Sequence, residues 1–312
     1  GDLIEVKKYL DLGFSQEIVD NAGRNLLLQS AVYGHMHLVE FFLGNRANIA
    51  KVDHNGNTIL HILAESNSPK APALIQLALR NGAYIAAKNY SNQTAAAKAI
   101  VKGNSATFKA FIDSGYDKNS TEENIPVVMY AYLKGRQPIA KVLIEAGADI
   151  NRQDSAGDTL LHLAASANDA GTVKSLLDAK AKINIKNALG KTPLMLALEK
   201  NRIPIAETLI KSGADISITD RQKRNILHYI APISQANKLL SAIPTQELNI
   251  DAKDENGNTP LLIAAESSQW NNVDLFLTMG AQVNISNRAG KTPLLFAGEK
   301  GNLSAVKNLM EK

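Results

Sequence analysis

Apolar residues recur at helical spacing along most of the chain. Each group pairs one residue with those three and four positions later, as in Val39, Phe42 and Leu43; Phe108, Phe111 and Ile112; Val173, Leu176 and Leu177; and Val273, Phe276 and Leu277. This spacing predicts helices with one buried face and one polar face. The groups are short and are separated by Gly, Asn and Asp, which favour turns. The pattern therefore predicts many short helices rather than a few long ones.

A second pattern places these helices in a repeat. A segment of the type Gly-x-Thr-Pro-Leu-x-x-Ala returns at a period of about 33 residues. Its anchor positions are Asn25, Thr58, Thr94, Pro126, Thr159, Thr192, Asn225, Thr259 and Thr292. About 21 residues after an anchor a Gly-Ala-Asp-Ile-Asn run follows, as at Gly147 and, in shortened form, at Gly213. A fixed period of this length predicts a stacked-repeat architecture.

Each part of the repeat has a physical role. Thr159 and its equivalents precede a helix, where their hydroxyl can accept a backbone N–H of the first turn. Pro193 follows its threonine at the first helical position, where a missing N–H costs nothing. Gly213 stands where the second helix ends and a left-handed conformation is needed. A single helix pair cannot bury its apolar face alone, but stacked copies can.

The Thr-Pro-Leu-x-Leu-Ala-Ala and Gly-Ala-Asp-Ile-Asn runs resemble the ankyrin repeat over nearly the whole chain. The resemblance implies an all-α repeat solenoid of helix–turn–helix units with β-hairpin-like fingers and a concave face. We expect about nine repeats and an opening half repeat, since Gly13 falls where a second helix ends, with a further segment before Gly1 in the natural protein. The predicted single domain 1–312 then divides into 1–19, 20–53, 54–89, 90–120, 121–153, 154–186, 187–219, 220–253, 254–286 and 287–312.

The amino-acid composition excludes several classes of protein. Apolar residues make up 45% and charged residues 21%, which excludes a disordered chain. No apolar run is long enough to span a membrane. The absence of cysteine excludes disulfides and thiolate chemistry. Lys and Arg exceed Asp and Glu by 34 − 30 = 4, so no nucleic-acid partner is expected.

Several repeats depart from the pattern. An insertion lies around residues 65–72, and Lys98 stands where other copies have Leu or Ile, which predicts a weakened core there. Pro126 replaces the capping Thr. Lys223 replaces a Gly, where a left-handed backbone would cost roughly 1–2 kcal/mol. Pro232 is predicted to shorten its helix.

The sequence offers little catalytic chemistry. His61, His162 and His228 occupy the same position of separate repeats, so we expect them to brace the fingers by hydrogen bonds rather than to bind metal. His35 and His37 are two residues apart and do not share a helix face. No hydrolase, phosphate-loop or dinucleotide motif occurs. We therefore predict no catalytic activity, no cofactor and no metal, and we place Trp270 in the core.

The variable positions predict a binding surface. Finger tips and first-helix ends differ between repeats, and Tyr and Arg among them are frequent at interaction hot spots. The candidates are Arg24, Tyr33, His54, Asn57, Glu65, Tyr90, Gln93, Lys102, Asp158, Lys191, Arg221, Lys223, Arg224, Glu255, Asn258, Arg288 and Lys291. Residues 182–224 carry nine cations against four anions, 9 − 4 = +5, which could favour an acidic partner.

These observations favour a non-enzymatic scaffold, monomeric itself, that binds another protein through its concave finger and inner-helix surface. The alternative is a targeting or regulatory arm of a larger protein, such as a secreted bacterial effector or an envelope-anchored protein, whose active part lies elsewhere. The cytoplasm and, for a bacterial protein, the periplasm or the exterior all remain open. Abundant Lys, Asn and Ile hint at a bacterial source.

The irregular repeats should be the least stable part of the stack. We expect backbone amides in residues 90–130 and 220–245 to exchange with solvent faster than those in 155–215, because degenerate repeats bury fewer apolar contacts. Native-state hydrogen exchange followed by mass spectrometry measures this directly. Equal protection of all three segments would contradict the prediction.

Overall fold

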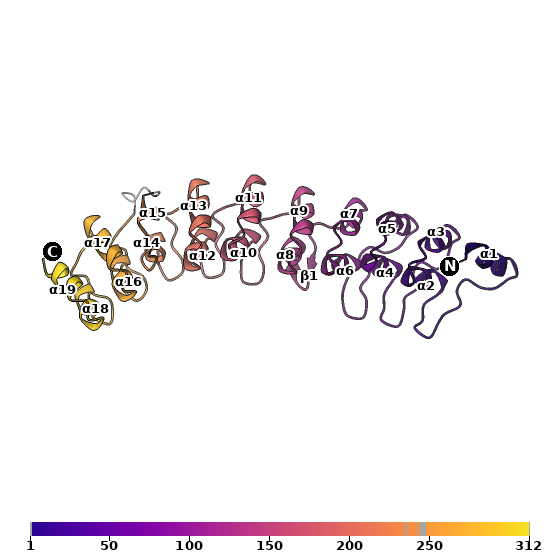
Figure 1. Cartoon of the computed structure of the whole chain (residues 1–312), viewed down its shortest axis with the longest axis horizontal. Coiled ribbons are helices and arrows are strands. Elements are labelled where there is room, and N and C mark those ends of the chain that lie inside the picture. Colours follow the sequence, from indigo (N-terminus) through magenta and orange to yellow (C-terminus); the bar gives the residue numbers. More distant parts are fainter. Residues whose placement is uncertain (1, 235, 242, 244–247, 312) are drawn as a thin grey trace. The chain divides into compact units, whose positions relative to one another are not determined.

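The computed structural model describes residues 2–234, 236–241, 243 and 248–311, and within them the chain is almost wholly helical. Its contacts divide into two compact units, one ending at Ile150 and one beginning at Asn151. Each unit is a row of short helices in pairs, with the finger loops projecting from one side of the row (Figure 1). The predicted all-α repeat architecture is confirmed.

The first unit opens with a single helix and continues in pairs. One finger contains a two-stranded antiparallel hairpin in which Thr121 pairs with Pro126 and Glu122 with Ile125. The elements are α1 (Leu3–Asp11), α2 (Leu26–Val32), α3 (Met36–Gly44), α4 (Ile59–Glu65), α5 (Ala71–Arg80), α6 (Ala95–Lys102), α7 (Ser105–Asp113), β1 (Thr121–Glu122), β2 (Ile125–Pro126), α8 (Val127–Leu133) and α9 (Gln137–Glu145).

The second unit repeats the arrangement, with one shortened pair. Its elements are α10 (Leu160–Ser166), α11 (Ala170–Asp178), α12 (Pro193–Glu199), α13 (Ile203–Lys211), α14 (Ile226–Ile230), α15 (Ala236–Leu240), α16 (Pro260–Glu266), α17 (Trp270–Thr278), α18 (Pro293–Glu299) and α19 (Leu303–Met310).

Two layers of helices form the core of each unit. The first helices of successive repeats pack on one another, as α2, α4 and α6 do in the first unit and α10, α12, α14, α16 and α18 in the second. Second helices such as α3, α5, α7 and α9 form the other layer. The stripes predicted from the sequence lie inside, since Phe42, Phe108, Phe111 and Phe276 are almost fully buried. Stacking thus buries the face that one hairpin leaves exposed.

The fingers are built on a repeated side-chain turn. The Oδ1 atom of Asp154 accepts hydrogen bonds from the backbone N–H groups of Ala156 and Asp158, both at 2.9 Å. The equivalent residue does the same in seven other fingers, at Asp20, Asp53, Asn89, Asn187, Asp220, Asp254 and Asn287. Such turns fix a loop locally, before any tertiary contact is made.

Hydrogen bonds between neighbouring tips join the fingers. The N–H of Ala188 donates to the carbonyl of Ala156 at 2.9 Å, and that of Arg221 donates to Leu189 at 3.0 Å. Gly157 permits this approach, because a Cβ there would lie 2.6 Å from the Ala188 nitrogen. Its φ of 76° also favours glycine.

The repeat that begins near Thr94 keeps its core, contrary to the sequence prediction. Helix α6 buries four alanines and Ile100, so small side chains fill the space between neighbouring helices. Lys98 is half-buried, and its ammonium lies 3.0 Å from the Glu65 carboxylate on α4. The ion pair gives the lysine a partner at a position where other repeats place an apolar residue.

Pro126 removes the helix cap, as predicted, and a hairpin takes over the finger. No side chain caps α8. Glu122 on β1 turns inward, and its Oε1 accepts hydrogen bonds from the Thr94 hydroxyl at 2.6 Å and the Tyr116 hydroxyl at 2.9 Å. This finger is therefore tied to the preceding repeat by a carboxylate.

Both irregularities predicted for the 220–253 repeat are present. Lys223 has a φ of 61°, in the left-handed region that its glycine equivalents adopt freely. Helix α14 has five residues where the other first helices of this unit have seven. The low stability expected for 90–130 and 220–245 stays a prediction, and residues 235, 242, 244 and 245 lie outside the described residues.

The three repeat histidines brace the fingers, as the sequence predicted. The backbone N–H of Thr159 donates to Nδ1 of His162 at 3.1 Å, and Nε2 of His162 lies 3.1 Å from the carbonyl oxygen of Lys191 in the next finger. Since an N–H only donates and a carbonyl only accepts, the ring is neutral with its proton on Nε2. His61 and His228 make the same two contacts.

This geometry makes stability depend on pH. Burial lowers the pKa of His61, His162 and His228. Below about pH 6.5 these histidines are therefore protonated in the unfolded chain while they stay neutral in the folded chain. As a result, the free energy of unfolding falls as the pH drops toward the lowered pKa. We expect a loss of up to about 1.4 kcal/mol per histidine per pH unit in that window.

Urea unfolding at pH 7.5, 6.5 and 5.5 measures the slope, and His162→Met tests its origin. Methionine is compatible with the site because Met195 occupies the equivalent position in the next repeat. The variant should be less stable at pH 7.5 and should lose less stability on acidification. A slope identical to that of the unsubstituted protein would contradict the assignment to His162.

Candidate functional site

The sequence-predicted binding residues fall into three groups by exposure. Nine are exposed: Tyr33, His54, Glu65, Tyr90, Lys102, Arg221, Lys223, Glu255 and Arg288. Six are half-buried: Arg24, Gln93, Asp158, Arg224, Asn258 and Lys291. Asn57 and Lys191 are buried, at 9% and 7% exposure. The structure distributes them along both units rather than gathering them in one site.

Several of the polar finger residues hold neighbouring fingers together. The side-chain Oδ1 atoms of Asn57, Asp158 and Asn258 accept hydrogen bonds at 2.8–3.0 Å from the side-chain amides of Asn89, Asn187 and Asn287 in the next finger. Gln93 contributes its backbone carbonyl to His61. These positions are structural contacts between repeats, whatever else they bind.

The finger cations next to the first helices are mostly paired. The ammonium of Lys191 lies 2.8 Å from both carboxylate oxygens of Glu199, and Lys291 pairs with Glu299 in the same way at α18. Arg24 pairs with Asp20 at 2.7 Å and lies over the Tyr33 ring. The net charge of +5 counted over residues 182–224 is therefore partly neutralised in place. Arg221 and Lys223 remain as exposed cations without an ion pair in the described residues.

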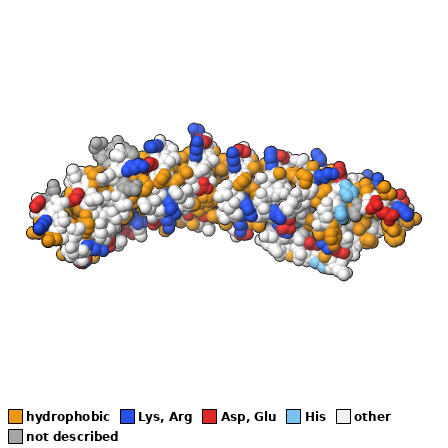
Figure 2. Space-filling model, viewed as in Figure 1, with side chains coloured by type: hydrophobic (Ala, Val, Ile, Leu, Met, Phe, Trp, Pro, Cys, Tyr) orange, Lys and Arg blue, Asp and Glu red, His pale blue; other side chains and the backbone are white. Residues whose placement is uncertain are grey.

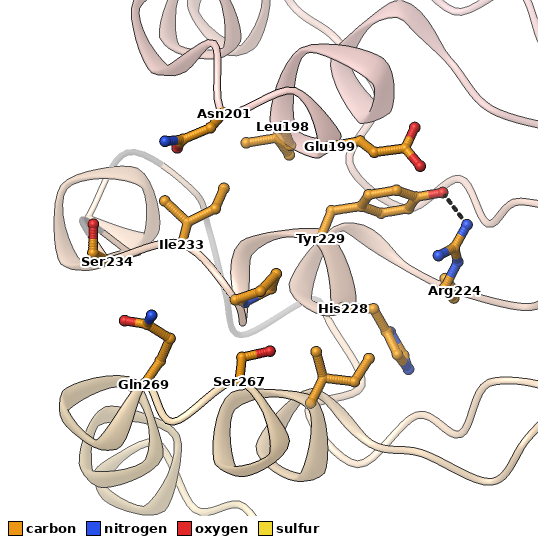
Figure 3. Close-up of a pocket in the computed structure, with 12 residues that line it drawn as sticks. Leu198, Glu199, Asn201, Arg224, His228, Tyr229, Ile233, Ser234, Ser267 and Gln269 are labelled. Atoms are coloured by element: carbon orange, nitrogen blue, oxygen red, sulfur yellow. Dashed lines mark hydrogen bonds between the residues drawn. The ribbon is translucent and has the colours of Figure 1, made fainter.

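A hollow of about 460 Å³ opens in the second unit where α14 is short (Figure 3). Its floor is apolar, with Leu198 from α12, Ile233 from the segment after α14, and Ile263 from α16. Its rim is polar and includes Asn201 and Gln269, which lie on opposite sides of Ile233 in Figure 3. The hollow lies where α14 ends at Ile230, two residues before Pro232, which also lines it.

Two residues that line the hollow, Arg224 and Tyr229, form a polar triad with Asp220. The Tyr229 hydroxyl donates to Oδ2 of Asp220 at 2.6 Å and accepts from the Arg224 guanidinium at 2.9 Å. The same guanidinium lies 2.8 Å from Asp220 and 4.7 Å from the Tyr229 ring centroid. Burial alone would raise the pKa of Asp220, but the hydrogen bonds from Tyr229 and Arg224 outweigh it and lower that pKa. Burial and the hydrogen bond to Asp220 raise the pKa of Tyr229, so its hydroxyl stays protonated at neutral pH.

Asn272 on α17 supports the floor of the hollow. The Asn272 side-chain amide donates to two carbonyl groups that follow α14, that of Ala231 at 2.9 Å and that of Ile233 at 2.7 Å. The Ile233 carbonyl also accepts from the backbone N–H of Ala236 at 3.2 Å. Asn272 is 2% exposed. Because buried carbonyls need donors, this amide helps to satisfy the backbone where α14 ends early.

Sequence reasoning missed Asn272 and Gln269. An asparagine at a position where other second helices carry Leu38, Ile139 or Ile205 was the available signal. Gln269 stands where Asn104, Asp169 and Asn302 cap their helices, but it makes no cap hydrogen bond.

Trp270 was expected in the core, and the structure corrects this. The buried face of α17 is formed by Asn272, Val273 and Phe276, while Trp270 is half-buried at a small hollow beside α19.

Other site types find no support within the described ranges. No group of three or more His, Asp or Glu side chains there is arranged to hold a metal ion. Among the described helices, none has the length and apolar character needed to cross a membrane. Cationic and anionic side chains are interspersed over the face shown in Figure 2.

Comparison with known protein families decides the assignment. Models of the ankyrin repeat match residues 27–71, 68–154, 128–220 and 222–312. The chain belongs to the ankyrin-repeat family. Ankyrin repeats generally mediate protein–protein interaction and are themselves non-catalytic.

Curated relatives share parts of the array. The palmitoyltransferase AKR1 of Lachancea kluyveri is 34% identical over 30% of this chain and 13% of its own length. An ankyrin repeat-containing protein of Schizosaccharomyces pombe is 33% identical over 30% of this chain and 41% of its own. The human SH3 and multiple ankyrin repeat domains protein 2 is 30% identical over 45% of this chain and 8% of its own. The chain thus spans less than half of each of these relatives.

Replacing Asn272 tests how the irregular repeat is held. Asn272→Leu should lower the free energy of unfolding by about 1–3 kcal/mol, because the buried carbonyls of Ala231 and Ile233 each lose a donor. The neighbouring Asn271 is exposed and makes no side-chain hydrogen bond in the described structure, so Asn271→Leu should change stability by less than about 0.5 kcal/mol. Urea unfolding measures both. Equal effects of the two changes would contradict the supporting role of Asn272.

Proposed function

We propose that this ankyrin array is a non-enzymatic scaffold that binds another protein through its fingers and first-helix ends. The supporting observation is that repeats share buried positions while the exposed side chains in equivalent places differ. At the end of the first helices, for example, the residue eight positions after the anchor is Tyr33, Lys102, Lys200 or Ser267. A row of differing side chains on a fixed backbone can be specific for one partner.

Rigidity supports the same proposal. The fingers are held by local turns, by tip-to-tip backbone bonds and by side-chain bridges, so little conformational entropy is lost when a partner docks. Tyr33 and Tyr90 are 66% and 77% exposed, which is unusual for large aromatic side chains. Exposed Tyr on a rigid frame is typical of interaction hot spots.

A second candidate is that the array serves as the binding arm of a longer protein. The observation in its favour is that each of the three relatives is much longer than its matched segment. In both proposed functions, the exposed residues of the fingers and first-helix ends bind a partner protein.

Charge reversal at the finger tips tests the proposal. We expect the variant Arg221→Glu with Lys223→Glu to capture its partner from native lysate at least about tenfold less well. The two introduced carboxylates would repel an acidic surface that the exposed cations attract. The matched control, Lys174→Glu with Lys211→Glu, makes the same change at exposed positions on the second helices α11 and α13. Quantitative mass spectrometry of the captured proteins measures the ratio.

Loss of the same captured protein in both variants would point to net charge alone. Unchanged capture by the finger variant would remove Arg221 and Lys223 from the binding surface.

A further inference from the structure

The hollow at the short helix α14 differs chemically from the rest of the binding face. Its charged lining groups are already paired: Glu199 with Lys191, and Arg224 with Asp220. His228 has both ring nitrogens engaged, with Asn225 on one side and the Asn258 carbonyl on the other. Among the described residues that line it, the hollow therefore offers no unpaired charge to a ligand. A charged group that enters it would lose its hydration without compensation from these residues.

The floor offers apolar surface instead. Leu198 and Ile233 are 1% and 6% exposed, and Ile263 is half-buried, so the depression ends on packed hydrocarbon. Its volume of about 460 Å³ is within the range of about 300–1,000 Å³ that well-formed ligand pockets occupy. An apolar side chain placed there would gain roughly 25 cal/mol for each Å² it removes from water.

The rim supplies hydrogen-bonding groups suited to a polypeptide backbone. Asn201 and Gln269 lie on opposite sides of the hollow, and neither side chain makes a hydrogen bond in the described structure (Figure 3). A side-chain amide both donates and accepts, which complements the N–H and C=O of an extended peptide. Gln269 is available because it does not cap α17, unlike Asn302, which caps α19.

We propose that this hollow binds an extended segment of a partner protein that inserts one uncharged apolar side chain between α12 and α16. The flanking peptide backbone hydrogen-bonds to Asn201 and Gln269. This specificity rests on the proposed function, since it names the chemistry that one part of the binding face selects. The Asn272 amide makes the pocket possible by holding the carbonyls of residues 231 and 233.

Selection from a random library tests the specificity without knowledge of the natural partner. Phage-displayed nine-residue peptides are selected on the full chain, and the affinities of enriched peptides are measured by fluorescence anisotropy. We expect them to share one large uncharged apolar residue. Replacing that residue with Asp or Lys should weaken binding by at least about tenfold.

A matched pair of variants locates the binding. Ser267→Trp places a bulky ring at the hollow and should weaken the peptides at least about tenfold. Ala167→Trp makes the same change at the equivalent exposed position, the residue after α10, and should change affinity less than about twofold. Gln269→Leu keeps the side-chain size but removes the amide, and should cost about fivefold. Equal urea midpoints for the variants show that each is folded.

The outcomes separate this inference from the proposed function. Peptides that bind Ser267→Trp as tightly as the unsubstituted protein, a required charged residue in the enriched peptides, or no enriched peptide at all would each overturn the pocket assignment. The proposed function would then still stand or fall with capture of the native partner by the finger variant. Loss of capture in that variant together with unaltered peptide binding by Ser267→Trp would keep the scaffold and reject the pocket.

Discussion

The backbone hydrogen bond between neighbouring finger tips sets the spacing of repeats within each unit. It recurs from His54 to Ala22, from Tyr90 to Asn55 and from Glu255 to Gln222 at 2.9–3.0 Å. Each bond needs its own finger held in one conformation, which the Asp or Asn turn provides. Because the tips are fixed at this distance, the first helices behind them stack in register. Equivalent side chains of successive repeats then form rows, and these rows are what a partner would meet.

The short helix α14 shows how the stack tolerates a break. Pro232 ends the helix early, and a buried end would leave carbonyl groups unsatisfied. The side-chain amide of Asn272 from the next repeat donates to the carbonyls of Ala231 and Ile233, and the backbone N–H of Ala236 also donates to that of Ile233. The hollow described above lies where this helical turn is missing. The early end of α14 and the hollow therefore occur at the same place in the stack.

Pairing of charges differs between the ends of the first helices and the finger tips. Lys191 and Glu199, like Lys291 and Glu299, bridge the finger and the end of the first helix within one repeat. Such pairs leave little net charge near the helices, while Arg221, Lys223 and Arg288 stay exposed at the tips. The finger tips are thus suited to charge-dependent recognition. The hollow beneath them is suited to an uncharged side chain.

The sequence by itself determined the repeat, its caps and its fingers, because these depend on contacts within about four residues or on a period of about 33. The bracing role of His162, the left-handed Lys223 and the short α14 could all be inferred from such local signals. Tertiary structure alone decided that four alanines and Ile100 suffice for the core around α6, that Trp270 lies off the buried face of α17, and that Lys191 is held by Glu199. It also decided that Asn272 satisfies carbonyls 39 and 41 residues away. These outcomes depend on which side chains from different repeats are in contact. Local sequence patterns do not predict such contacts between residues that are far apart along the chain.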